Sequence, residues 1–140
     1  ILRCQYCDTA YAFTGGKLMS VDDILSTVAS FNTRYVCVTG GEPLAQANCA
    51  SLLARLCDAG YRVSLETSGA MSLAGVDSRV VKVVDIKTPG SGEERRNRYD
   101  ELSTLGHHDQ VKFVITSRDD RVVGDVARFE WYRATLRRRP

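Results

Sequence analysis

Two cysteines near the start of the 140-residue chain have the spacing that most clearly indicates chemistry. Cys4 and Cys7 are separated by two residues, and two such thiolates can share a zinc ion, hold part of an iron–sulfur cluster or form a redox disulfide. A structural zinc site would require two further Cys or His ligands at a recognisable spacing. The pair by itself therefore leaves three kinds of site open.

The other three cysteines do not extend this pair into a regular set of ligands. They stand singly within segments that have the pattern of strands and helices, and they are Cys37, Cys49 and Cys57. Free cysteine often behaves as a small core hydrophobe, so we expect all three to be buried. An odd total of five cysteines without a framework also argues against a disulfide-stabilised secreted protein and favours reduced thiols.

A four-iron cluster held by three thiolates would need one ligand in addition to Cys4 and Cys7. We expect this ligand to be a cysteine directly before Ile1, which would complete a C-x3-C-x2-C motif. The chain begins with Ile rather than Met, and no predicted strand or helix precedes the thiol pair. We therefore expect the sequence to be a fragment of a longer chain.

Short runs of β-forming residues alternate with helical patterns along the sequence. The runs predict strands at residues 35–39, 61–65, 80–86 and 110–115. Helices are predicted at residues 20–32 with Ser20 as the N-cap, at 46–59 ending at Gly60, at 97–105, and from about Arg118 onward. This alternation predicts an α/β fold with a parallel sheet and right-handed crossovers.

The first three predicted strands each end in a cluster of polar and glycine residues, at 40–43, 66–69 and 85–90. Ligand sites of barrels and open parallel sheets lie at the carboxyl ends of the strands. We therefore expect these clusters to converge on one surface, with the loop that carries the two thiols lying over it.

Two segments resemble motifs of the radical S-adenosylmethionine (SAM) superfamily. Residues 1–9, Ile-Leu-Arg-Cys-Gln-Tyr-Cys-Asp-Thr, resemble its cluster loop, and residues 38–43, Val-Thr-Gly-Gly-Glu-Pro, resemble its glycine-glycine-glutamate-proline motif. More narrowly, the chain up to about Thr116 resembles the 7-carboxy-7-deazaguanine synthase family. That resemblance is carried by Cys-Asp-Thr-Ala-Tyr-Ala-Phe, Thr-Gly-Gly-Glu-Pro-Leu-Ala-Gln, Leu-Glu-Thr-Ser-Gly-Ala and Asp-Ile-Lys-Thr-Pro-Gly-Ser-Gly-Glu. It implies a truncated, partial (β/α) barrel, in which residues 1–140 form a single domain without its first strand and its C-terminal part.

The resemblance also implies roles for the residues that match the family's motifs. Cys4 and Cys7 would be ligands of a [4Fe-4S] cluster, and Thr9 would be a ligand of Mg²⁺. The residues implied to bind SAM are Tyr6, Asp8, Gly41, Glu42, Asp85 and Lys87. Those implied to bind the substrate are Thr39, Glu66 and Ser68. No residue of the chain can be assigned from its sequence as the acid or base for loss of ammonia.

The implied reaction converts 6-carboxy-5,6,7,8-tetrahydropterin to 7-carboxy-7-deazaguanine with release of ammonia, a step toward queuosine and related deazapurines. The reduced cluster would cleave SAM to methionine and a 5′-deoxyadenosyl radical, which takes a hydrogen from the substrate and later returns it. A flavodoxin-like electron donor and a homodimer are implied as partners. Three alternatives stay open: another radical SAM enzyme such as an activase, a non-catalytic two-thiol metal or redox domain, and a fragment that is itself inactive because it lacks one cluster thiol.

The overall composition restricts the partners. A formal net charge of +2 with mixed signs gives no extended basic field, so a nucleic-acid partner is not expected. No apolar run approaches the roughly 20 residues that span a bilayer, so we expect a cytoplasmic protein without a membrane partner. Adjacent His107 and His108 lie in a polar stretch and are expected to form a solvated loop rather than a metal site.

Overall fold

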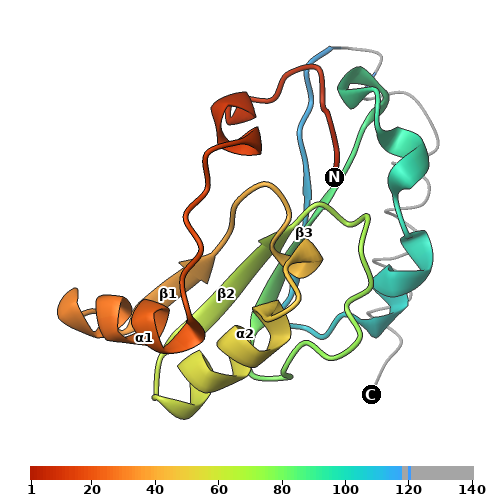
Figure 1. Cartoon of the computed structure of the whole chain (residues 1–140). Coiled ribbons are helices and arrows are strands. Elements are labelled where there is room, and N and C mark those ends of the chain that lie inside the picture. Colours follow the sequence, from red (N-terminus) through yellow and green to blue (C-terminus); the bar gives the residue numbers. More distant parts are fainter. Residues whose placement is uncertain (118–119, 121–140) are drawn as a thin grey trace.

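The computed structural model of the chain describes residues 1–117 and 120. Four strands form a single parallel sheet in the order β1-β2-β3-β4, so strands that follow one another in sequence are neighbours in the sheet. The strands are β1 (Tyr35–Val38), β2 (Arg62–Thr67), β3 (Val81–Ile86) and β4 (Gln110–Phe113). The predicted α/β fold, with the parallel sheet expected of a partial (β/α) barrel, is confirmed (Figure 1).

One α-helix precedes β1, and a second lies between β1 and β2. Helix α1 (Val21–Ser30) begins where it was predicted to begin, because the Ser20 Oγ accepts a hydrogen bond from the Asp23 N–H at 3.0 Å. Helix α2 (Cys49–Asp58) begins three residues later than predicted. The short 3-10 helix η2 (Pro43–Ala45) precedes it, and Gln46 then has an extended ψ of 123°, which interrupts the helical path. The N-terminal segment contains a further 3-10 helix, η1 (Ala10–Phe13).

The connections between the later strands are less regular. Residues 68–80, between β2 and β3, contain no helix in the structure. Between β3 and β4 the chain forms three 3-10 helices, η3 (Pro89–Ser91), η4 (Glu94–Arg96) and η5 (Tyr99–Thr104). The last of these lies within the span 97–105, where a helix was predicted. The helix predicted from Arg118 lies outside the described residues. None of the helices in the described part of the chain has the length and apolar character required to cross a membrane.

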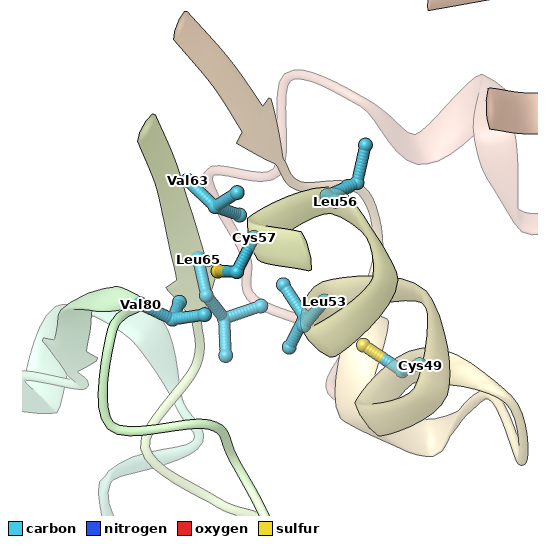
Figure 2. Close-up of a cluster of buried hydrophobic side chains, with 7 residues drawn as sticks. All are labelled: Cys49, Leu53, Leu56, Cys57, Val63, Leu65 and Val80. Atoms are coloured by element: carbon cyan, nitrogen blue, oxygen red, sulfur yellow. The ribbon is translucent and has the colours of Figure 1, made fainter. Parts of the chain in front are cut away.

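The two faces of the sheet differ in polarity because side chains alternate along each strand. On β2, Val63, Leu65 and Thr67 are buried, whereas Arg62 is exposed and Glu66 is only partly covered. The buried side packs against α2, where Leu53 and Leu56 are also buried, and Figure 2 shows this cluster together with Cys49, Cys57 and Val80. A second cluster covers the same side of β3 through Val84, Ile86, Leu102 and Leu105. The opposite side of the sheet is left polar.

The cysteines of the sheet and helix follow this division. Cys49 and Cys57 are buried, as predicted, but the prediction for Cys37 is wrong because this residue is exposed. Cys37 pairs in register with Ser64, while its neighbours Val36 and Val38 pack against the core. The alternation of β1 therefore places the Cys37 side chain on the polar face.

Candidate functional site

A cavity of about 430 Å³ lies between the N-terminal loop and the carboxyl ends of the strands. In Figure 1 the N-terminal segment runs beyond the arrowheads of the sheet, in agreement with the predicted position of the thiol loop. Every predicted site residue except Glu42 lines this cavity: Cys4, Tyr6, Cys7, Asp8, Thr9, Thr39, Gly41, Glu66, Ser68, Asp85 and Lys87. The fold thus brings together residues from four separate segments of the sequence.

The thiol loop is a tight turn that is hydrogen-bonded to the segment after β3. The Cys7 N–H donates to the Cys4 carbonyl at 3.1 Å, which closes the turn. The Gln5 N–H donates to the Ser91 carbonyl at 3.0 Å, so the loop is attached to the turn that follows β3. The Arg3 N–H also donates to Glu93 Oε1 at 2.7 Å. These contacts fix the two cysteines over the strand ends.

The two thiols are partly buried and lie beside other polar groups of the cavity. Cys7 Sγ and Thr9 Oγ1 are 3.6 Å apart. Burial raises the pKa of the Cys4 thiol; the positive charge of Lys87 opposes this shift, and the negative charges of Glu93 and Asp85 add to it. A positively charged centre bound at Cys4 would favour the thiolate over the thiol.

No third metal-ligating side chain joins the thiols within the described part of the chain, where no group of three or more His, Cys, Asp or Glu residues could hold a metal ion. His107 and His108 are exposed in a loop, with ring centroids 4.0 Å apart, and they do not line this cavity. This position agrees with the prediction that they form a solvated loop.

Asp85 and Lys87 form a shielded ion pair at the end of β3. The Lys87 Nζ lies 2.8 Å from Asp85 Oδ2, and the two side chains are 11% and 16% exposed. Burial by itself would lower the pKa of Lys87, but the hydrogen bond to Asp85 and the nearby negative charges outweigh it, so the net shift is upward. The other carboxylate oxygen, Asp85 Oδ1, is buried and has no hydrogen-bond partner among the described residues.

Glu42 is buried and does not line the cavity. Its Oε1 accepts hydrogen bonds from the Leu44 N–H at 3.0 Å and the Thr67 hydroxyl at 2.8 Å. Its Oε2 accepts from both the N–H and the hydroxyl of Ser68. A carboxylate has about four acceptor positions, and all four are used here. These hydrogen bonds hold the loop after β1 against the end of β2, and the predicted contact of Glu42 with SAM stays a prediction.

The cavity is also lined by residues for which no role was predicted from the sequence, namely Leu2, Phe13, Gly40, Lys112 and Val114. Lys112 is the notable one because its Nζ lies 3.3 Å from Glu66 Oε2. Its position could have been inferred from alternation in the fourth predicted strand, where Val111 and Phe113 are apolar and a lysine stands between them.

Comparison with known proteins identifies the family. The model of the radical SAM superfamily matches residues 1–121. A Koribacter versatilis protein named 7-carboxy-7-deazaguanine synthase is 46% identical over 121 residues, which are 85% of this chain and 54% of that protein. Proteins of the same name from Chlorobaculum tepidum and Methanospirillum hungatei are 46% and 40% identical, over 67% and 85% of this chain and 43% and 50% of their own lengths. The chain spans about half the length of the curated relatives it matches. Since the superfamily match runs through residues 1–121, the chain belongs to the radical SAM superfamily.

Proposed function

We propose that the protein is a 7-carboxy-7-deazaguanine synthase, which contracts the ring of 6-carboxy-5,6,7,8-tetrahydropterin with release of ammonia. One observation carries this proposal: residues from the thiol loop and from the ends of β1, β2 and β3 surround a single cavity. The relatives that bear this name support it. Loss of one ammonia accounts for the whole difference between substrate and product, so the reaction needs no net oxidant.

The residues of the cavity fit a [4Fe-4S] cluster and SAM. Cys4 and Cys7 supply soft thiolate ligands of the kind that hold iron–sulfur clusters. Within residues 1–117 and 120 no further ligand accompanies them, so the third thiolate of the proposal comes from outside the described residues. When bound, the cluster and SAM supply the radical that abstracts hydrogen from the substrate.

The chain's own residues would bind and orient SAM. A Cβ added at Gly41 would meet no other atom within 4 Å, so the space beside this glycine is open to a ligand that approaches the backbone. Asp85 lines the cavity, and its carboxylate would balance the charge of an ammonium group. Tyr6 and Asp8 line the same cavity and would contact the adenosyl portion, and Lys87 would support this side of the site. The direct contact between Glu42 and SAM remains a prediction that the hydrogen bonds of Glu42 do not favour.

The substrate would occupy the part of the cavity nearer β1 and β2. Thr39, Glu66 and Ser68 lie there and offer hydroxyl and carboxylate groups to a polar heterocycle. Thr9 would provide one ligand to Mg²⁺, which keeps waters and accepts substrate oxygens, so a single protein ligand suffices in this proposal. A flavodoxin-like electron donor, a homodimer and a cytoplasmic location complete the proposal.

Anaerobic reconstitution with iron and sulfide, on a chain that also carries the third cysteine of the proposal, tests this function. We expect about four irons per chain, an EPR signal of the reduced cluster that changes on addition of SAM, and turnover of the carboxylated pterin to the deazaguanine. Cys4→Ala and Cys7→Ala should each abolish cluster loading, and Gly41→Ala should weaken the SAM effect on the EPR signal without preventing loading. Stoichiometric zinc without a cluster would instead indicate a two-thiol metal domain. A SAM-responsive cluster without pterin turnover would indicate another radical SAM enzyme.

A further inference from the structure

In the described part of the chain, three lysine–carboxylate ion pairs include a residue of the sheet. Only one of these three pairs lines the cavity with both side chains half exposed. In the Lys82–Asp109 and Lys87–Asp85 pairs, each side chain is at most 16% exposed. In the third pair, Lys112 and Glu66 are 43% and 44% exposed, and the distance from Nζ to Oε2 is 3.3 Å. A half-exposed pair of this kind contributes little to stability and can exchange contacts readily.

The position of Lys112 is fixed by the strand that carries it. Its neighbours Val111 and Phe113 pack against the core cluster of β3 and η5, so alternation along β4 directs Lys112 to the opposite, polar side of the sheet. There it is in register with Asp85 and reaches across to Glu66 on β2. The ammonium group is thus held over the cavity by a regular strand rather than by a loop.

The charges of the cavity make Lys112 the cation best able to bind an anionic ligand. Asp8, Glu66 and Asp85 contribute negative charge, and the cations that line the cavity in the described residues are Lys87 and Lys112. Lys87 is buried and held by Asp85 at 2.8 Å. Lys112 has three N–H donors, of which one is directed to Glu66, so two can serve a ligand while the ion pair persists.

We propose that Lys112 binds the carboxylate of the substrate and thereby determines specificity for a carboxylated pterin over one that lacks this group. The inference rests on the proposed function and deepens it. Glu66 holds the ammonium group in place before the substrate arrives, and its own remaining acceptor positions are free to receive N–H groups of the heterocycle. A carboxylate has two oxygens, so contact with Lys112 leaves the other oxygen for Mg²⁺.

Binding measurements on the protein with its cluster reconstituted, at fixed Mg²⁺ and SAM, test this proposal. Lys112→Gln should weaken binding of 6-carboxy-5,6,7,8-tetrahydropterin by about tenfold or more, the range expected for loss of a hydrogen bond between charged groups. Binding of tetrahydropterin without the carboxylate, and of SAM, should change less than about twofold, well below that range. Lys112→Arg, which keeps the charge, should recover most of the affinity. Lys17→Gln, at an exposed lysine that does not line the cavity, is the control for the change in net charge.

The possible results separate this inference from the function on which it rests. Equal weakening for both pterins, weakening of SAM binding alone, or unchanged affinity in Lys112→Gln would each overturn the role of Lys112 while the synthase function stands. Failure of the unsubstituted protein to bind the carboxylated pterin would overturn both. A circular dichroism melting curve like that of the unsubstituted protein shows that the variant is folded, so that a loss of affinity reports on the contact.

Discussion

The carboxylate of Glu42 joins the loop after β1 to the end of β2 through its hydrogen bonds with Leu44, Thr67 and Ser68. Glu42 is 6% exposed, so water cannot replace partners that are lost. In Glu42→Gln, one acceptor oxygen is exchanged for an NH₂ group, which then faces the N–H of either Leu44 or Ser68. We expect the free energy of unfolding to fall by about 1–3 kcal/mol, the cost of leaving buried polar groups unsatisfied. Urea denaturation without cluster or SAM measures this loss.

Glu66→Gln is the matched control for Glu42→Gln. It makes the same chemical change, but at a half-exposed side chain that is paired with Lys112. Its effect on unfolding should stay below about 1 kcal/mol, as for other exposed ion pairs. If Glu42→Gln left the cofactor-free protein as stable as the control and weakened only SAM binding, Glu42 would be a ligand contact and the structural role described here would be wrong.

Individual residues also show what the sequence could and could not predict. The cavity residues were predictable because the motifs that contain them follow strands, and parallel strands end on one surface. The side of the turn to which Glu42 points depends on Thr67 and Ser68, which lie 25 and 26 residues away, and no local pattern contains that information. Cys37 was misassigned for a related reason: β1 has an apolar composition but buries only one of its faces.

The turn after β3 is the element that connects the thiol loop to the sheet. Asp120 is 3% exposed and accepts hydrogen bonds from the Gly90 N–H at 2.7 Å and from both the N–H and the hydroxyl of Thr116 at 2.8 and 2.7 Å. A Cβ at position 90 would lie too close to the Thr116 hydroxyl and the Asp120 carboxylate, so these side chains would have to move to accept any other residue. The turn held in this way carries the Ser91 carbonyl that receives the Gln5 N–H. Asp120 therefore supports the thiol loop from a distance.

These hydrogen bonds, first those of Thr116 and then that of Gly90, hold the pKa of Asp120 well below its ordinary value of 3.8. A carboxyl whose pKa is lower in the folded state stabilises the protein above its unfolded pKa, and this contribution is lost as the pH falls through the folded pKa. We expect Asp120→Asn to melt at a lower temperature than the unsubstituted protein at pH 7. The difference should shrink below about pH 4, where the carboxyl of the unfolded chain becomes protonated.

Hydrogen exchange shows whether the effect of Asp120→Asn reaches the thiol loop. The amides of residues 5–7 should exchange faster in this variant, because the turn that holds Gln5 is loosened. Asp100→Asn, at a side chain 75% exposed, should leave both the melting temperature and this exchange unchanged. A loop whose exchange rates are the same in all three proteins would contradict the proposed connection.

The helices and strands differ in how far local sequence determines them. The Ser20 cap bonds a residue only three positions away, and the amphipathic pattern of α1 lies within the helix itself. The start of α1 was therefore predicted correctly. The segment between β3 and β4 instead depends on distant contacts: Asn97 exchanges hydrogen bonds with the backbone of Lys87, and the Arg98 N–H donates to the Gly69 carbonyl. With these anchors the segment forms three 3-10 helices, of which the sequence predicted a helix only at the position of the last, η5.

In the molecule as a whole, the polar face that borders the cavity and the face that packs on the core are opposite faces of one sheet. Cavity residues extend from Leu2 to Val114, and those outside the N-terminal loop lie on or directly after a strand. On β2, Leu65 is fully buried between Ser64 and Glu66, so the core cluster holds in place the strand that carries Glu66. The geometry of the cavity should therefore persist only as long as the core is folded.

Leu65→Ala tests this dependence without altering any residue that lines the cavity. Removing a fully buried leucine side chain should lower the free energy of unfolding by about 2–5 kcal/mol, a large part of the roughly 5–15 kcal/mol typical of a domain. On heating the reconstituted protein, the cluster absorbance and the circular dichroism should be lost together, at a lower temperature than in the unsubstituted protein. Leu18→Ala, at a side chain 99% exposed, should leave both transitions in place. Retention of the cluster absorbance after loss of the helical signal would show that the thiol loop holds its metal independently of the sheet.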